Sequence, residues 1–161
     1  MIVVSDASPM LNLAAIHRLD LLRALYERVA IPETVHAEIA GSADDLPGAL
    51  EFKAADWIEV RRPGDTALVT TLRAELHAGE AEAIALAHEL RADLILLDER
   101  KGRAAAARLN LRVVGLLGVL VEAKHKGLVP ALKPLLHELT TRAGFWIGKE
   151  LFQAVLIAAG E

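Results

Sequence analysis

The chain has 161 residues, of which 53% are hydrophobic and 25% are charged, and its formal net charge is −4. This length and composition predict a single folded domain over residues 1–161 and exclude a disordered chain. The negative balance disfavours a protein that coats nucleic acid, and the absence of cysteine excludes disulfides, thiolate metal sites and cysteine nucleophiles. We expect a cytoplasmic protein without a signal peptide or a membrane span, since the longest apolar run, 113–121, is too short to cross a bilayer.

The chain alternates short apolar runs with segments of helical periodicity. In chain order, the first half predicts a strand at 2–4, a helix at 10–25 that is interrupted near 18–20, a strand at 28–31, a helix at 32–41, a loop at 41–47, a helix at 47–55, a strand at 57–60 and a turn at 61–65. Ser8 is the expected N-cap of the first helix, and Pro9 its expected first residue.

The second half continues the same alternation and ends in helices alone. It predicts a helix at 66–76, a helix at 79–91, a strand at 94–97, a basic helix at 100–109, a strand at 112–114 and helices at 116–126, 130–142 and 147–159. Strands separated by helices predict an α/β fold, a three-layer α/β/α sandwich around a mostly parallel sheet.

Four acidic residues stand at positions where such a fold collects them. Asp6 and Asp98 directly follow predicted strands, whereas Glu38 and Glu80 lie in predicted helices. Taken singly, each has an ordinary explanation as a helix cap, a first-turn acid or a solvated residue. Ligands bind beyond the carboxyl ends of parallel strands, and carboxylates gathered there suit hard divalent cations. Together, the four acids therefore predict a metal pocket at one edge of the sheet.

Three stretches of the sequence resemble a known family. IVVSDASPMLNLA, GEAEAIALAHELRADLILLDERKGR and GFWIGKEL resemble the PIN domain family of metal-dependent ribonucleases, and most closely a VapC-like branch of stand-alone prokaryotic toxin ribonucleases. The resemblance implies a Rossmann-like fold with an acidic pocket for Mg²⁺ or Mn²⁺. In this resemblance the four acids of the pocket, in chain order, are Asp6, Glu38, Glu80 and Asp98. Ser8 matches the small hydroxyl residue that supports the pocket.

Several neighbouring residues leave alternatives open. Glu82 and Glu99 adjoin the matched acids, but residues two apart on a helix point in different directions, so Glu80 is preferred to Glu82. Three cations close to Asp98 either hold substrate phosphates or form a solvated helix face: Arg100, Lys101 and Arg103.

The aromatic pair at 145–146 also has two interpretations. Phe145 and Trp146 either stack on a nucleic-acid base or pack a helix start into the core or a dimer contact.

The resemblance implies a metal-dependent endoribonuclease, a hydrolase of single-stranded or structured RNA in which two ions about 4 Å apart clamp the phosphodiester. The expected role is the toxin of a toxin–antitoxin pair, with RNA as substrate, a small antitoxin as partner and a homodimer as assembly. The alternative is a catalytically inactive PIN-like module that binds RNA or protein. A dehalogenase-like phosphatase is disfavoured, because it needs a second Asp where Ser8 stands. Nucleotide-binding glycine motifs are missing after the first predicted strand.

Overall fold

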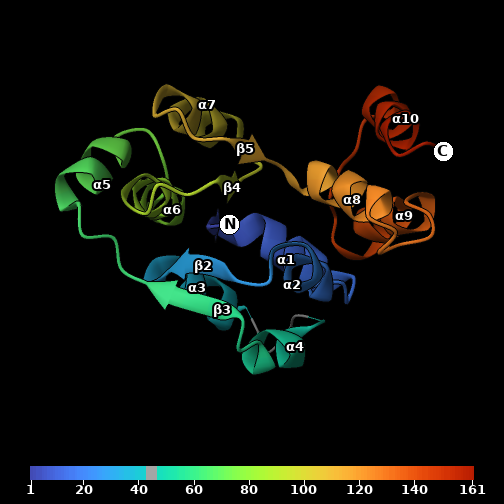
Figure 1. Cartoon of the computed structure of the whole chain (residues 1–161), viewed down its shortest axis with the longest axis horizontal. Helices are drawn as coiled ribbons and strands as arrows, with labels where there is room; N and C mark the ends of the chain where they lie inside the picture. The colour runs from blue at the N-terminus through green and yellow to red at the C-terminus, as the bar shows by residue number, and fades with distance from the viewer. Residues whose placement is uncertain (43–46) are drawn as a thin grey trace.

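The computed structural model describes residues 1–42 and 47–161, which form a five-stranded sheet covered by helices (Figure 1). The strand order is β3-β2-β1-β4-β5, and every neighbouring pair is parallel. The strands are β1 Val3–Ser5, β2 Val29–Pro32, β3 Ile58–Arg61, β4 Leu94–Leu96 and β5 Val113–Val114. All five predicted strands are confirmed within one or two residues at each end.

The helices in the described part of the chain follow the predicted periodic segments. They are α1 Ala7–Ala15, α2 Asp20–Tyr26, α3 Glu33–Gly41, α4 Ala49–Ala54, α5 Thr66–Leu72, α6 Ala78–Glu89, α7 Arg100–Arg108, α8 Leu116–His125, α9 Lys133–Arg142 and α10 Lys149–Ala158. Most of the predicted loop at 41–47 lies outside the described residues. Within those residues, no helix is both long enough and apolar enough to cross a membrane.

The start of α1 corrects the sequence-based prediction. Asp6, in an extended conformation, is the N-cap residue, so Ser8 lies inside the helix and Pro9 is its third residue. A proline without an N–H is tolerated there, because the first four N–H groups of a helix have no acceptor within it. The helix can therefore begin directly at the end of β1, which leaves no loop after Asp6. The predicted start of α9 at Pro130 is also wrong, since that helix begins at Lys133 with a proline in its first two positions.

Two apolar clusters sandwich the sheet, because successive side chains of a strand point to opposite faces. Val3 and Leu96 belong to the larger cluster, whereas Val4 and Ile95 belong to the smaller one. The larger cluster includes side chains of α1, α2, α8, α9 and α10, and the smaller one includes side chains of α6 and α7. Figure 1 shows these two groups of helices on opposite sides of the strands, which confirms the three-layer α/β/α sandwich.

The register of the central strands positions the acidic residues. Ser5 at the end of β1 pairs with Leu96 at the end of β4, and the Asp6 N–H donates to the Leu96 carbonyl oxygen over 3.0 Å. The two carboxyl ends are therefore level, with Asp6 and Asp98 just beyond them. Strand β2 lies on the other side of β1 and leads directly into α3, which carries Glu38 to the same edge.

Candidate metal centre

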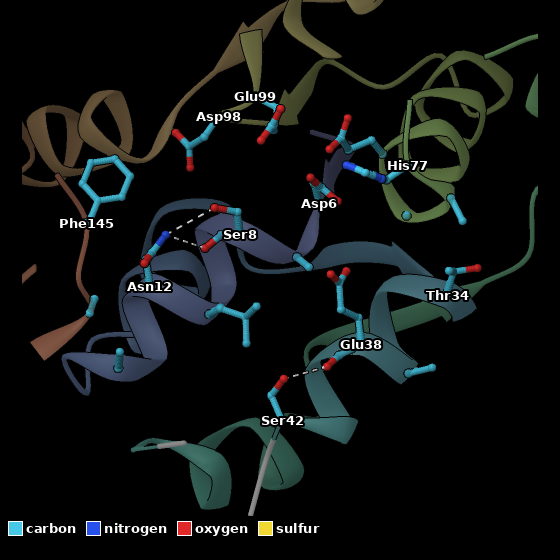
Figure 2. A pocket seen from close by; sticks show the side chains of 18 of the residues that line it. Asp6, Ser8, Asn12, Thr34, Glu38, Ser42, His77, Asp98, Glu99 and Phe145 are labelled. Carbon is cyan, nitrogen blue, oxygen red and sulfur yellow. Dashed lines mark hydrogen bonds between the residues drawn. The ribbon is translucent and has the colours of Figure 1, made fainter. Parts of the chain in front are cut away.

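A cavity of about 1290 Å³ opens at the carboxyl edge of the sheet. Four acids from distant parts of the sequence line it, and we call them the acidic wall: Asp6, Glu38, Glu80 and Asp98. Figure 2 shows Asp6 near the centre, with the side chain of Glu38 pointing toward it from one side and Asp98 lying on the other side. The fold thus brings together all four acids that the sequence predicted as one pocket.

Asp6 is the least exposed of these carboxylates. It is only 5% exposed, and its side chain makes no capping hydrogen bond at the start of α1. Burial is the largest cause that raises the pKa of Asp6, from 3.8 to about 6, and the nearby Ala7 N–H opposes this rise. Repulsion from the other acids raises its pKa further, in the order Glu80, Glu38 and Asp98. Asp6 therefore lies within electrostatic reach of the whole acidic wall.

Glu80 is the second buried acid, 7% exposed, in the first turn of α6. Burial raises the pKa of Glu80, repulsion from Glu99 adds to the rise, and His77 opposes it. His77 is the N-cap residue of the same helix and also lines the cavity. The helix N-terminus supplies partial positive charge to a first-turn carboxylate, which helps to keep this acid in place.

Asp98 is anchored through one oxygen and free at the other. Its Oδ1 accepts a hydrogen bond of 2.8 Å from the Leu116 N–H at the start of α8. Its Oδ2 is buried without a hydrogen-bond partner among the described residues. Burial raises the pKa of Asp98, while the Leu116 N–H and nearby Arg103 lower it. A buried, unpartnered carboxylate oxygen is costly unless a cation or a donor reaches it.

A glycine leaves space between two carboxylates of the acidic wall. A Cβ atom on Gly79 would lie 3.4 Å from Glu38 Oε2 and 3.7 Å from Asp6 Oδ1. Both oxygens therefore face the same point beside the start of α6. The missing side chain keeps that point open to a small ligand.

These observations test whether the residues suit a divalent ion. The four acids offer only oxygen ligands, as Mg²⁺ and Mn²⁺ prefer, and one of their oxygens lacks a partner. In the described part of the chain, no three acidic or histidine side chains already stand close enough to form a finished metal site. Carboxylates that repel one another stand apart until a cation neutralises them, so the chemistry of the acidic wall fits such an ion.

Two acids that the sequence left ambiguous are now placed. Glu99 lines the cavity beside Asp98, whereas Glu82 does not line it and has one buried, unpartnered carboxylate oxygen elsewhere on α6. The preference for Glu80 over Glu82 at the cavity agrees with this placement.

The predicted phosphate-binding residues fall outside the cavity. Arg100, Lys101 and Arg103 are exposed on the first turn of α7, and none of these three described residues lines the cavity. Arg103 lies close to Asp98, since a Cβ atom on Gly115 would be 2.8 Å from both Arg103 Nη1 and Asp98 Oδ1. Their role in binding phosphates stays a prediction, and it would require an RNA strand that extends beyond the cavity.

Ser8 lines the cavity together with polar residues that the sequence analysis missed. Asn12 donates from Nδ2 to the Ser8 carbonyl oxygen at 3.0 Å and to Ser8 Oγ at 3.3 Å (Figure 2). The spacing of four residues on a predicted helix was the available signal for this pair. Thr34 and His77 also line the cavity, near the starts of α3 and α6.

The segment at the end of α9 lines the cavity on the side where Asp98 and Asn12 lie (Figure 2). Three residues there line it, and we call them the C-terminal wall: Arg142, Ala143 and Phe145. No sequence pattern pointed to Arg142, because only the packing of α9 against α1 brings this segment to the site.

Comparison with known proteins agrees with this fold. A sequence profile of the PIN domain family matches residues 2–161. The chain belongs to the PIN domain family. No curated protein matches it. Among solved structures, it is similar to a PilT N-terminus domain protein from the hyperthermophilic archaeon Sulfolobus solfataricus P2, with a TM-score of 0.54 and 19% identity over 76% of this chain and 93% of that one. PIN domains are generally nucleases and typically use divalent metal ions.

Proposed function

We propose that this PIN domain is an endoribonuclease that depends on Mg²⁺ or Mn²⁺. The observation that carries the proposal is the acidic wall: four carboxylates from separate segments line one cavity, and Asp6 is repelled by the other three. Gathering like charges in a buried site destabilises the protein, which is expected where the site serves function rather than folding.

The proposed ligands follow from their surroundings. Asp6 and Asp98 act as principal ligands, because both lie directly beyond the central strands. The Asp6 side chain makes no capping hydrogen bond at the start of α1, and Asp98 Oδ2 is buried without a partner among the described residues. Glu38 and Glu80 complete the site, directly or through water. When bound, the divalent ions supply Lewis-acid stabilisation of the charge that develops on the phosphodiester and activate water for attack.

The test is cleavage of a labelled single-stranded RNA in the presence of Mn²⁺. We expect Asp6→Asn to reduce the cleavage rate at least about 100-fold while the circular dichroism spectrum is unchanged, because a neutral amide removes both charge and ligand. Asp56→Asn is the matched control, since this aspartate is exposed and does not line the cavity. Full activity of Asp6→Asn would contradict the assignment.

The alternative, an inactive module, is separated by metal binding. A module that only binds RNA or protein should show no saturable Mn²⁺ site in titration calorimetry, and a nuclease should show one that Asp6→Asn weakens. The presence of all four acids favours the nuclease.

We further propose that the protein is a toxin, cytoplasmic and VapC-like, with a small antitoxin and a second copy of itself as partners. The family supports this proposal, since many PIN domains are toxins. The test is growth of a bacterial culture after induction of the wild-type protein and of Asp6→Asn. Growth arrest that needs Asp6 would support the toxin role, and equal growth of both cultures would contradict it.

A further inference from the structure

The acidic wall and the C-terminal wall differ in charge and in chemistry. The acidic wall is anionic, and Glu99 adds a further carboxylate beside it. Among the described residues that line the cavity, Arg142 is the only arginine or lysine, and Phe145 is the only Phe, Tyr or Trp. A nucleic-acid strand whose phosphate meets the acidic wall through cations therefore has one direct cation and one aromatic ring beside it.

The backbone holds Phe145 in this position. Gly144 adopts a left-handed conformation, with φ +67°, and ends α9. The N–H of Phe145 then donates to the Leu139 carbonyl oxygen over 3.0 Å, which returns the chain to the helix. The ring is half-buried and packs partly against the larger apolar cluster. Figure 2 shows it on the side of the cavity where Asn12 and Asp98 lie. A ring held on one side by the core is a rigid surface for a second flat group.

The neighbouring Trp146 provides an internal comparison. It is 84% exposed and does not line the cavity, and its ring lies next to Gly148 instead. The two aromatic residues of the FW pair therefore have different surroundings, and of the two only Phe145 lines the cavity.

Arg142 is available to an anion. Its only ion pair among the described residues is with Glu138, one turn earlier on α9, at a separation of 4.0 Å; the Arg142 side chain is 58% exposed and that of Glu138 is 37% exposed. Such a pair on a helix surface is weak. A phosphate at the cavity would compete well for the guanidinium, which binds phosphate oxygens in a planar, bidentate geometry.

We propose that the C-terminal wall selects unpaired RNA: the ring of Phe145 stacks on a base next to the phosphate at the acidic wall, and Arg142 binds an adjacent phosphate. This inference rests on the proposed nuclease function and names the residues that choose its substrate. A base in a duplex already has neighbours on both faces, so it cannot stack on the ring unless it leaves the helix.

The experiment measures RNA binding separately from cleavage. Fluorescence anisotropy is recorded with Mn²⁺ on a labelled single-stranded RNA and on its duplex, both with phosphorothioate linkages that resist hydrolysis, so that the protein keeps all four carboxylates of the acidic wall. We expect Phe145→Leu to weaken binding of the single strand at least about fivefold and to leave duplex binding unchanged, because leucine keeps the apolar contact and removes the stacking surface. Phe145→Tyr, which keeps the ring, and Trp146→Leu, the matched control, should each stay within about twofold of the parent.

Arg142→Gln provides a second, exposed substitution that does not disturb the core. We expect it to reduce the slope of log affinity against log salt concentration by about 0.7, the value for one phosphate contact with a single strand. An unchanged slope would overturn the role of Arg142.

The outcomes distinguish this inference from the proposed function. If Phe145→Leu and its parent bind the single strand with equal affinity, the proposed role of the C-terminal wall is wrong, even if the wild-type protein cleaves RNA. Equal loss of single-strand and duplex binding would overturn it as well. The wild-type protein could also bind single-stranded RNA through Phe145 and yet neither cleave RNA nor bind Mn²⁺. That result would support RNA selection by the C-terminal wall and contradict the proposed nuclease function.

Discussion

The acidic wall and the C-terminal wall face one cavity but are held by different forces. Asp6 and Asp98 follow strand ends, Glu80 lies in the first turn of α6, and Glu38 lies within α3. Asp6 and Glu80 are almost fully buried, Asp98 is half-buried and Glu38 is exposed. The C-terminal wall is half-exposed, rests on apolar packing and a backbone hydrogen bond, and contains no repelled charge.

This difference matches the two proposed roles, metal-dependent cleavage at the acidic wall and RNA selection at the C-terminal wall. Burying repelled carboxylates lowers the stability of the metal-free protein, a cost that a bound divalent ion repays. Packing a ring at the rim carries no such cost. Substitutions in the acidic wall should therefore change metal binding and stability together, whereas substitutions in the C-terminal wall should change RNA affinity and leave metal binding unchanged.

The largest expected effect on stability comes from the charge of Asp6. Its pKa is about 6 in the folded protein, against an ordinary value of 3.8. The folded state therefore binds this proton more tightly than the unfolded chain does. The protonated carboxyl adds to the free energy of unfolding, fully below about pH 3.8, and this contribution is lost as the pH rises through about 6. Above that pH the loss is about 3 kcal/mol.

The measurement is urea unfolding of the metal-free protein and of Asp6→Asn across this pH range. We expect the variant to be the more stable protein near neutral pH, with a difference that shrinks toward acid, and Asp56→Asn to show no such trend. A variant that is less stable than the wild type at neutral pH would contradict the idea of repelled carboxylates.

A smaller effect should distinguish two acids of α6. Glu80→Gln is expected to weaken Mn²⁺ binding by at least about tenfold, since it removes a charged oxygen ligand. Glu82→Gln should leave Mn²⁺ affinity unchanged, because Glu82 does not line the cavity. Titration calorimetry of both variants compares them directly, and equal losses would mean that the metal lies elsewhere on the helix.

The smallest effect concerns the space beside the acidic wall. In Gly79→Ala the added methyl group would lie at contact distance from Glu38 Oε2 and Asp6 Oδ1. Alanine also favours the helix by up to about 1 kcal/mol, so thermal unfolding should occur at a higher temperature. We expect this gain together with a few-fold weaker Mn²⁺ affinity. Unchanged metal affinity would show that this space is not part of the site.

The sequence predicted the acidic wall because its signals are local. A short apolar run followed by an acid places Asp6 and Asp98 beyond two strands, and parallel strands bring such ends to one edge. The helical spacing separated Glu80 from Glu82 for an equally local reason. The choice of ion and the identity of the RNA have no such local pattern, and both stay predictions.

The position of Arg142 depends on packing, which no sequence pattern reports. Arg142 ends a helix that carries no motif, and it reaches the cavity only because α9 packs against α1. The early start of α1 was missed for a different reason, since a proline at the third helical position looks like a helix start although the first-turn N–H groups need no partner. Sequence patterns thus pointed to the four acids and to Phe145, but not to Arg142.

The most direct test is a crystal of this protein soaked in Mn²⁺ and measured for anomalous scattering. The account predicts manganese in the cavity at the carboxyl edge of the sheet, in contact with Asp6 and Asp98. Manganese bound only at other surfaces, with this cavity empty at saturating concentration, would contradict it.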